Sequence, residues 1–278
     1  MNRTYIIADI GACHDGSLAR MQDAISAAKR AGCDAIKFQW TSDHHLMAAR
    51  RGNALDHGYA DIYARYLRFP EEWLGVLQAA CKAQGIDFMC TVFLPQDVPS
   101  VARLVSHFKV AAFESEDRLM LEACKEHRSG NQKVIVSLGM GTTARSATDM
   151  AMRAPALPRR HLVLMHCVSS YPTPDAELNI SRVRRQRLLG FSDHSLPDCS
   201  LSGALAVACG ARFLEAHLRL PSTDPKNPDF PHARTESQFA AYCADARKAE
   251  SMCGDGREGQ RRCEEKMSDF KTRESRDH

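Results

Sequence analysis

Two short stretches of the sequence decide its fold: Leu-Gly-Phe-Ser-Asp-His at residues 189–194 and Leu-Glu-Ala-His at residues 214–217. Each is an apolar run that ends abruptly in ionisable side chains, which is typical of a buried parallel strand with functional groups at its carboxyl end. A single histidine after a strand is more often structural than functional. Two of them, His194 and His217, at the ends of adjacent strands would lie close enough to share a divalent metal ion.

Apolar runs of this kind alternate with helical patterns along most of the chain. The strands are predicted at residues 5–11, 35–39, 87–91, 108–112, 133–137, 162–166, 189–194 and 213–217. The segments between them carry apolar side chains at helical spacing, as at Met21, Ala24, Ile25 and Ala28. Strict alternation requires a parallel sheet with helices outside it, so we predict an α/β fold, a single-domain (β/α)8 TIM barrel.

The barrel is expected over residues 1–256, followed by a mixed-charge C-terminal tail with few apolar residues over 257–278. Residues 40–68 are predicted to form one long loop that contains histidine and arginine side chains. A stretch of that length without helix or strand in a compact domain is usually functional. We therefore expect this loop to cover a substrate.

The composition narrows the class of protein. Apolar residues make up 44% of the chain and charged residues 26%, as in soluble globular proteins. The formal net charge of +3 is too small, and its cations too scattered, to favour nucleic acid or an anionic membrane as a partner. Eleven cysteines without a disulfide-framework spacing, and no signal-like segment, favour a reducing cytoplasm. Since the apolar runs are too short to span a bilayer, we expect a cytoplasmic protein.

Polar side chains at the predicted strand ends would all face one bowl of the barrel. They are Asp9, Lys37, Gln39, Lys109, Glu114, Ser137, Ser169, Ser170, Ser192, Asp193, His194 and His217. A lysine inside a short apolar run must either reach out to solvent or hold an anion, and we favour the anion. Two lysines and several hydroxyls suit a phosphate ester, whereas the histidines and carboxylates suit a divalent metal and proton transfer.

Seven segments resemble, in the same order, the motifs of the sialic acid synthase family. They are residues 7–11, 37–39, 108–111, 137–140, 169–174, 190–194 and 215–217, which together cover the predicted barrel. The resemblance implies condensation of phosphoenolpyruvate with an aldose to give a 2-keto-3-deoxy sugar acid and phosphate. It also implies a divalent metal cofactor, Mn²⁺ or Mg²⁺.

The same resemblance implies a role for each matching residue. His194 and His217 would bind the metal, and Asp9, Glu114 and His194 would be catalytic. Contacts to phosphoenolpyruvate or to the sugar would come from Lys37, Gln39, Lys109, Ser137, Ser169, Ser170, Tyr171, Ser192, Asp193 and Asp229.

The sequence also departs from the family's pattern. Asp9 stands where the family usually has glutamate, Cys13 where it has asparagine, Leu138 where it has threonine, and Ala216 where it has a basic residue. The Ala-Phe-Glu at residues 112–114 is closer to the Ser-Phe-Glu of pseudaminic acid synthases than to the Ser-Gly-Glu of sialic acid synthases. The metal motif is therefore retained while its surroundings differ.

Family members usually carry a C-terminal antifreeze-like domain that reaches into the partner subunit's site, and this chain resembles the barrel alone. A homodimer is compatible with the resemblance. We expect either that another chain supplies the lid or that the sugar is held by the chain's own loops, 40–68 and 227–232. In the second loop, His232 and Arg234 would lie near the bowl, although a solvated loop would explain them equally well.

We therefore predict a metal-dependent synthase that forms a carbon–carbon bond with phosphoenolpyruvate. Two alternatives remain open at this stage. One is a metal aldolase or lyase acting on a related keto acid, which would not require free phosphoenolpyruvate. The other is a catalytically retired barrel that binds sugar or a partner, although retention of both histidines and both lysines argues against it.

Overall fold

The computed structural model of the chain describes residues 3–52, 58–153 and 158–270. Its centre is a closed barrel of eight parallel strands in chain order, with the first strand paired to the last. The strands are β1 (Tyr5–Asp9), β2 (Ala35–Trp40), β3 (Asp87–Val92), β4 (Phe108–Val110), β5 (Val134–Leu138), β6 (Leu162–Cys167), β7 (Gly190–Asp193) and β8 (Phe213–His217). The predicted TIM barrel is confirmed, and each strand agrees with its predicted range to within a few residues.

Alternate residues along each strand face the inside of the barrel, because successive side chains of a strand point to opposite faces. The interior is filled by one buried apolar cluster, contributed by β1, β2, β3, β5 and β6, with Phe213 of β8 packed against it: Ile7, Ala35, Met89, Ile135, Val163 and Met165. Two residues further along β1, β2 and β8 come Asp9, Lys37 and Glu215. The apolar layers thus form a floor, and the polar residues face inward above it at the carboxyl ends.

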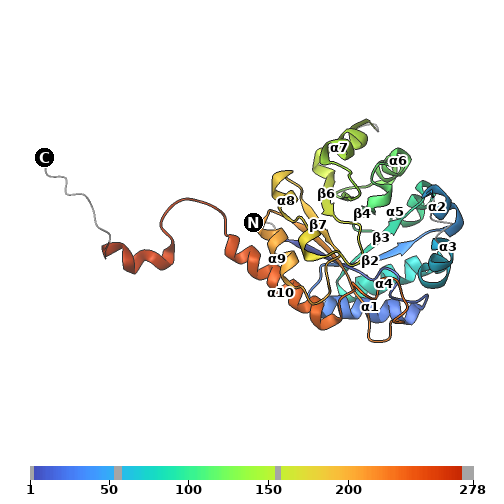
Figure 1. The fold of residues 1–278 in the computed structure, drawn as a ribbon, viewed down its shortest axis with the longest axis horizontal. Helices are drawn as coiled ribbons and strands as arrows, with labels where there is room; N and C mark the ends of the chain where they lie inside the picture. Colours follow the sequence, from blue (N-terminus) through green and yellow to red (C-terminus); the bar gives the residue numbers. More distant parts are fainter. Residues whose placement is uncertain (1–2, 53–57, 154–157, 271–278) are drawn as a thin grey trace.

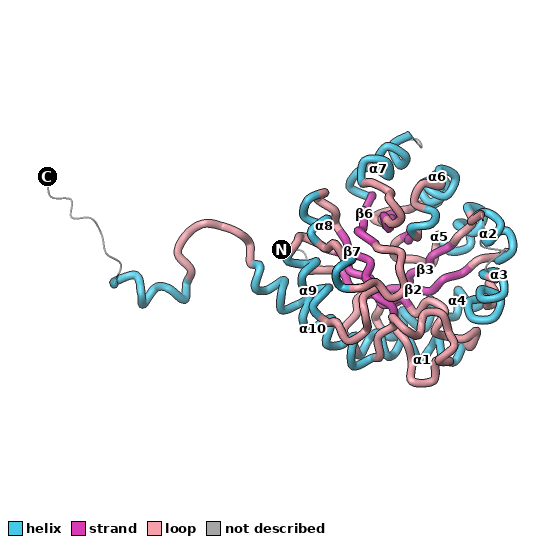
Figure 2. The backbone as a smooth tube through the Cα atoms, in the orientation of Figure 1, coloured by secondary structure: helices cyan, strands magenta, loops and turns pink. Residues whose placement is uncertain are grey.

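Helices surround the barrel, as Figures 1 and 2 show. They are α1 (Leu18–Arg30), α4 (Trp73–Gln84), α5 (Val98–Ala102), α6 (Arg118–His127), α7 (Ala144–Arg153), α8 (Ser181–Arg185), α9 (Leu201–Ala208) and α10 (Glu236–Cys253). The apolar face predicted for α1 is buried as expected. Thr235 caps the start of α10, in a reciprocal pair of side-chain to backbone contacts with Gln238.

The prediction of one long loop at residues 40–68 is wrong. The segment contains α2 (His44–Arg50), α3 (Tyr59–Ile62) and a π-helical turn (Tyr63–Leu67), while residues 53–57 lie outside the described residues. Met47 packs with Phe93 and Leu94 after β3, and Tyr66 and Leu67 pack with Ala12 after β1. Such short helices bury only a few side chains each, too few to produce a helical period in the sequence. We call residues 44–52 and 58–67 the cap segment.

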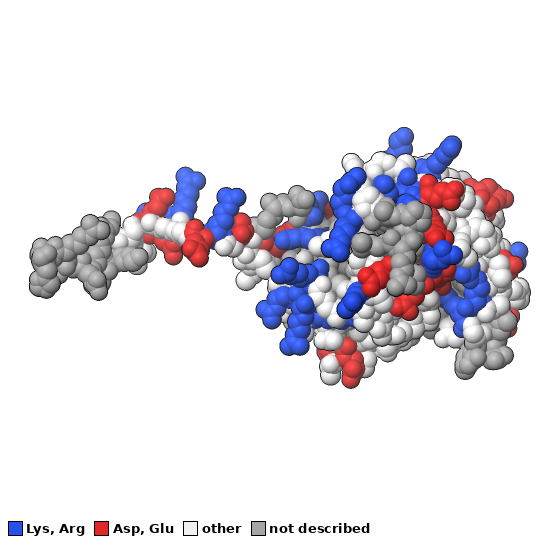
Figure 3. Space-filling model, turned by 90° about the horizontal axis from the view of Figure 1, so that it is seen from above, with Lys and Arg blue, Asp and Glu red and all other residues white. Residues whose placement is uncertain are grey.

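Beyond α10 the chain leaves the barrel and ends, within the described residues, in a 3₁₀ helix (Arg262–Phe270) that points away from it (Figure 1). Basic and acidic side chains are interspersed over the face of the barrel seen in Figure 3. Among the described residues, the helices are all too short or too polar to cross a membrane.

The inner apolar layer should contribute strongly to stability, and Ile135 is fully buried in it. We expect Ile135→Ala to lower the free energy of unfolding by about 2–5 kcal/mol, through lost transfer energy and a residual cavity. Denaturant unfolding monitored by circular dichroism measures this. The matched control, Leu205→Ala on the exposed face of α9, should change stability by about 0.5 kcal/mol or less. A loss below about 1 kcal/mol for Ile135→Ala would contradict this account of the core.

Candidate active site

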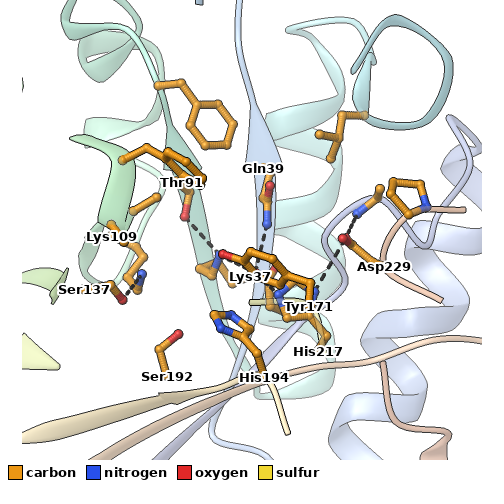
Figure 4. A pocket seen from close by; sticks show the side chains of 18 of the residues that line it. Lys37, Gln39, Thr91, Lys109, Ser137, Tyr171, Ser192, His194, His217 and Asp229 are labelled. Carbon is orange, nitrogen blue, oxygen red and sulfur yellow. Dashed lines mark hydrogen bonds and ion pairs between the residues drawn. The ribbon is translucent and has the colours of Figure 1, made fainter. Parts of the chain in front are cut away.

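A cavity of about 410 Å³ opens at the carboxyl ends of the strands, beneath the cap segment. This size is typical of a small-molecule site. Most of the predicted site residues line it, Asp9 among them. Figure 4 shows the others converging: Lys37, Gln39, Lys109, Ser137, Tyr171, Ser192, His194, His217 and Asp229. The structure thus brings together residues from β1, β2, β4, β5, β7 and β8, as the barrel requires.

The floor of the cavity is a chain of alternating charges. The Lys37 Nζ donates to Asp9 Oδ2 at 2.6 Å and to Thr91 Oγ1 at 3.0 Å, and it lies 3.9 Å from Glu215 Oε1. The same Glu215 oxygen lies 3.5 Å from Lys109 Nζ. All of these side chains are almost completely buried. Each ammonium thus faces a carboxylate, which compensates its charge in a site that excludes most water.

The pKa values of this group follow from competition between burial and charge. Burial alone would raise the pKa of Asp9, but Lys37 and His217 outweigh it and hold the pKa below its ordinary value. Burial would likewise lower the pKa of Lys37, but Asp9 and Glu215 raise it. Asp9 is therefore ionised. Since a carboxylate with a lowered pKa is a weak base, Asp9 is better suited to accepting a hydrogen bond from water than to removing a proton.

Hydroxyl groups complete the polar floor. Ser137 accepts from Lys109 Nζ at 2.9 Å, and Ser192 donates to Glu215 Oε1 at 3.2 Å. The Glu215 Oε2 has no hydrogen-bond partner among the described residues. Both serines also line the cavity. An incoming anion would therefore meet two ammonium groups and two rotatable hydroxyls on the same side.

The two predicted metal ligands are neighbours, with ring centroids 5.4 Å apart. The His194 Nδ1–H donates to the Val168 carbonyl at 2.9 Å, which leaves the Nε2 lone pair available. Burial, together with the nearby His217, lowers the pKa of His194 to about 4, so this imidazole is neutral at physiological pH. Neutral imidazole is the form that binds a metal ion.

His217 lies between two carboxylates. Its Nε2 is 3.7 Å from Asp9 Oδ2, and its Nδ1 is 3.5 Å from Asp229 Oδ2. Burial alone would lower the pKa of His217, but Asp9 and Asp229 raise it. The two carboxylates thus favour positive charge at this position, whether it is carried by the imidazole or by a bound cation. The donor set, imidazole nitrogens and a carboxylate, therefore fits a divalent metal ion.

Gly11 makes this arrangement possible. Its φ is +49°, and a Cβ added there would overlap the Asp229 carboxylate and the His217 ring. Backbone groups then fix the Asp229 side chain, because its Oδ2 accepts the Ala12 N–H at 2.7 Å. The turn after β1 and the loop after β8 are thus fitted closely together around the histidine.

Another part of the cavity wall is formed by aromatic rings and one arginine. Arg51, from the cap segment, donates from two nitrogens to Glu114 Oε1, at 2.9 and 2.6 Å. Its guanidinium lies over the rings of Phe93 and Phe113, at 4.8 and 4.6 Å from their centroids, and it also contacts the Tyr63 hydroxyl. Apart from Glu114, these residues all line the cavity.

Comparison with known proteins identifies the family of this site. The NeuB family profile matches residues 24–258, most of the chain. The chain belongs to the NeuB family. It is 28% identical over 268 residues to the pseudaminic acid synthase of Campylobacter jejuni, covering 92% of this chain and 76% of that one. It is 31% identical over 236 residues to the N-acetylneuraminate-9-phosphate synthase of Drosophila melanogaster, covering 79% of this chain and 61% of that one.

A solved structure shows the same fold. The N-acetylneuraminic acid synthetase of Leptospira borgpetersenii, in complex with citrate, matches with a TM-score of 0.82 at 22% identity, covering 97% of this chain and 91% of that one. NeuB proteins are sugar acid synthases that condense phosphoenolpyruvate with a sugar. This chain is accordingly an enzyme of that transferase class, which serves carbohydrate biosynthesis.

Several predicted residues of this NeuB barrel do not line the cavity. Asp193 is fully buried on the outer side of β7, where it accepts from Ser202 and from Arg234. Ser170 is exposed and donates to the Pro172 carbonyl, while Ser169 is half-buried beside the cavity. Glu114 is engaged by Arg51. Of the two alternatives for His232 and Arg234, the solvated loop is wrong, since both side chains are fully buried.

Other lining residues were missed from the sequence. Thr91 and Cys167 end strands β3 and β6 in inward positions, and the period-two pattern of those strands could have identified them. Glu215 alternates with His217 and could have been found in the same way. Arg51 carries no such signal, because its place in the site depends on how the cap segment folds back over the barrel.

The buried Arg51–Glu114 pair gives a test of how the cap segment is held. Burial raises the pKa of Glu114 in spite of Arg51. Removing Arg51 should therefore leave an unpaired buried carboxylate, at a cost of about 3–5 kcal/mol. Because the folded-state pKa of that carboxyl lies above the unfolded value, protonation relieves the cost at low pH. We expect Arg51→Met to destabilise the protein less at about pH 5 than at about pH 8.

Denaturant unfolding of both proteins at the two pH values measures this difference. The double variant Arg51→Met with Glu114→Gln is the control, since it carries no buried charge and should recover much of the loss at high pH. Equal destabilisation by Arg51→Met at both pH values would show that the pair does not hold the cap segment through charge.

Proposed function

We propose that this chain condenses phosphoenolpyruvate with an acylamino aldose, with the help of a divalent metal ion, to give a 2-keto-3-deoxy sugar acid and phosphate. The observation that carries the proposal is the convergence of two buried lysines, Lys37 and Lys109, with two histidines, His194 and His217, in one cavity. The lysines suit an anionic phosphate ester, and the histidines suit a cation.

Phosphoenolpyruvate would bind against the charged floor. Lys37 and Lys109 would hold its carboxylate and phosphate, and Ser137 and Ser192 would turn their hydroxyls toward the phosphate oxygens. Lys37 donates to Asp9 and Thr91, and Lys109 donates to Ser137 and to the Val110 carbonyl. Since an ammonium group carries three N–H bonds, each lysine would keep one donor for an incoming oxygen.

The metal ion, when bound, would polarise the aldehyde oxygen of the open-chain sugar. His194, kept neutral by burial, and His217 would hold it. Because His217 has a raised pKa, it would release its proton as the cation binds. The electrophilic carbon of the sugar would therefore lie beside the two histidines.

The proposed reaction consumes phosphoenolpyruvate, the aldehyde and one molecule of water. The enol carbon of phosphoenolpyruvate forms the new bond to the aldehyde carbon, and water adds at the carbon that bears the phosphate. Asp9, ionised beside Lys37 and held by Gln39 at 2.9 Å, would accept a hydrogen bond from that water and orient its oxygen. The bond between this carbon and the ester oxygen then breaks, phosphate leaves, and the keto group remains.

The substituted end of the sugar would lie against the aromatic side of the cavity. Tyr63, Phe93 and Phe113 offer apolar surface for an acyl methyl group, and the Arg51 guanidinium is close by. The relatives named as synthases of pseudaminic acid and N-acetylneuraminate-9-phosphate also support an acylamino sugar. All of these wall residues belong to the barrel and the cap segment, which would cover this end of the sugar.

Phosphate release tests the proposed function. Chain, phosphoenolpyruvate and Mn²⁺ are incubated with a panel of acetamido sugars, free hexosamines and simple aldoses, and phosphate and keto acid are measured. We expect release in step with keto acid formation, fastest with an acetamido sugar. Cleavage of a keto acid without any use of phosphoenolpyruvate would instead indicate the aldolase or lyase alternative.

The two lysines give a further prediction. Lys37→Met and Lys109→Met should each raise the KM for phosphoenolpyruvate well above tenfold, because each removes a charge-assisted contact of about 1.5–3 kcal/mol. Steady-state kinetics at saturating sugar measures this. Lys248→Met, on the exposed side of α10, is the matched control and should leave KM unchanged. A change below about threefold at either buried lysine would contradict its assignment to the anion.

A further inference from the structure

His232, in the loop between β8 and α10, has a buried imidazole that makes no hydrogen bond to the described residues. Its side chain is 0% exposed, and neither ring nitrogen has a hydrogen-bond partner among the described residues. The nearest carboxylate oxygen, Asp229 Oδ1, is 3.8 Å from Nε2, too far for a hydrogen bond. A buried polar group without a partner is costly, so its presence calls for a ligand.

A structural histidine of the same barrel makes the contrast clear. His166, on β6, is equally buried and stacks on Phe191. Its Nε2–H donates to the Leu178 carbonyl at 2.8 Å, which ties the ring to the chain. Nothing comparable holds the imidazole of His232, whose neighbours are the rings of His217 at 4.5 Å and Tyr171 at 5.2 Å.

The unpartnered ring completes a set of metal-binding groups. Ligand atoms of His217, Asp229 and His232 all lie within 4.8 Å of one another. The His194 ring is further from His232, with 6.0 Å between centroids, and faces the cavity. Two imidazoles and one carboxylate are therefore close enough together to bind the same cation.

The loop is built to hold these groups in place before any cation arrives. The Asp229 carbonyl accepts from the backbone N–H of both His232 and Ala233, so the two ligands lie on one turn. The Arg234 N–H then donates to the His217 carbonyl at 2.8 Å. The fully buried Arg234 guanidinium donates to Asp193 at 3.1 Å, which anchors the turn to β7. Such fixed outer contacts are what metal ligands require.

We propose that His232 is a further protein ligand of the cation held at His217, together with Asp229, and that this additional imidazole makes the site select a first-row transition-metal ion over Mg²⁺. This inference rests on the proposed function, since that function is what calls for a cation at His217. Imidazole nitrogen binds Fe²⁺, Co²⁺ and Zn²⁺ well, whereas Mg²⁺ prefers oxygen ligands in octahedral geometry. A second imidazole therefore favours the transition metals.

Metal binding to the chelator-treated full chain tests the inference directly. Isothermal titration with Co²⁺ and with Mg²⁺ gives the two affinities, and the visible absorption of bound Co²⁺ reports its nitrogen ligands. We expect the wild-type chain to bind Co²⁺ at least about tenfold more tightly than Mg²⁺. His232→Ala should weaken Co²⁺ binding by about 10–100-fold, change the Co²⁺ spectrum, and leave Mg²⁺ binding within about threefold.

Two controls keep the test decisive. His166→Ala removes an equally buried imidazole and should leave Co²⁺ affinity and spectrum unchanged. If His232→Ala does not fold, His232→Gln preserves most of the side-chain volume, and its thermal midpoint should no longer rise on addition of Co²⁺ as the wild-type midpoint does. Equal affinity of the wild-type chain for Mg²⁺ and Co²⁺, or unchanged Co²⁺ affinity in the His232 variants, would overturn the inference.

The outcomes separate this inference from the proposed function. Cation binding that depends on His232, in a chain that releases no phosphate from phosphoenolpyruvate with any sugar, would support the site and refute the function. Phosphate release by a chain whose Co²⁺ affinity does not depend on His232 would support the function and refute the inference.

Discussion

The structure depends on the compensation of charge inside the barrel. Asp9, Lys37, Glu215 and Lys109 come from four different strands and are almost completely buried. Each ammonium must face a carboxylate, because an unpaired charge in this position would cost several kcal/mol. Strand register achieves this: Asp9 lies beside Lys37 on one side and His217 on the other. Only a closed barrel brings the first and last strands together, so the charged floor can form only when the barrel is closed.

The second constraint is closure of the cavity from above. The cap segment is pinned to the barrel by the Arg51–Glu114 pair and by apolar contacts of Met47, Tyr66 and Leu67. It thereby contributes aromatic and cationic surface that the strand ends lack. A residue expected to be catalytic, Glu114, thus serves in this structure to position Arg51 and the segment that carries it.

His217 connects the two halves of the site. One ring nitrogen faces Asp9 and the charged floor, and the other faces Asp229 and the loop after β8. Gly11 leaves the space that this contact needs. A change in the position of Asp229 would therefore alter the electrostatics of the floor, because the His217 imidazole contacts both Asp229 and Asp9.

The sequence by itself determined the barrel and most of its floor. Apolar runs that end in polar residues fix strands, and alternation of side chains along a parallel strand sends Asp9, Lys37, Lys109, Ser192 and His217 inward. The same alternation sends Asp193 outward from its inward neighbour Ser192, although both had been assigned to the site.

Only the tertiary structure decided the pairing of Arg51 with Glu114 and the placement of His232. Arg51 and Glu114 are 63 residues apart, and the short helices between β2 and α4 bury too few side chains to leave a periodic pattern. The direction of His232 depends on one turn that is held by a buried arginine and by the β8 backbone. Contacts of this kind join segments distant in sequence, and no local pattern of residues encodes them.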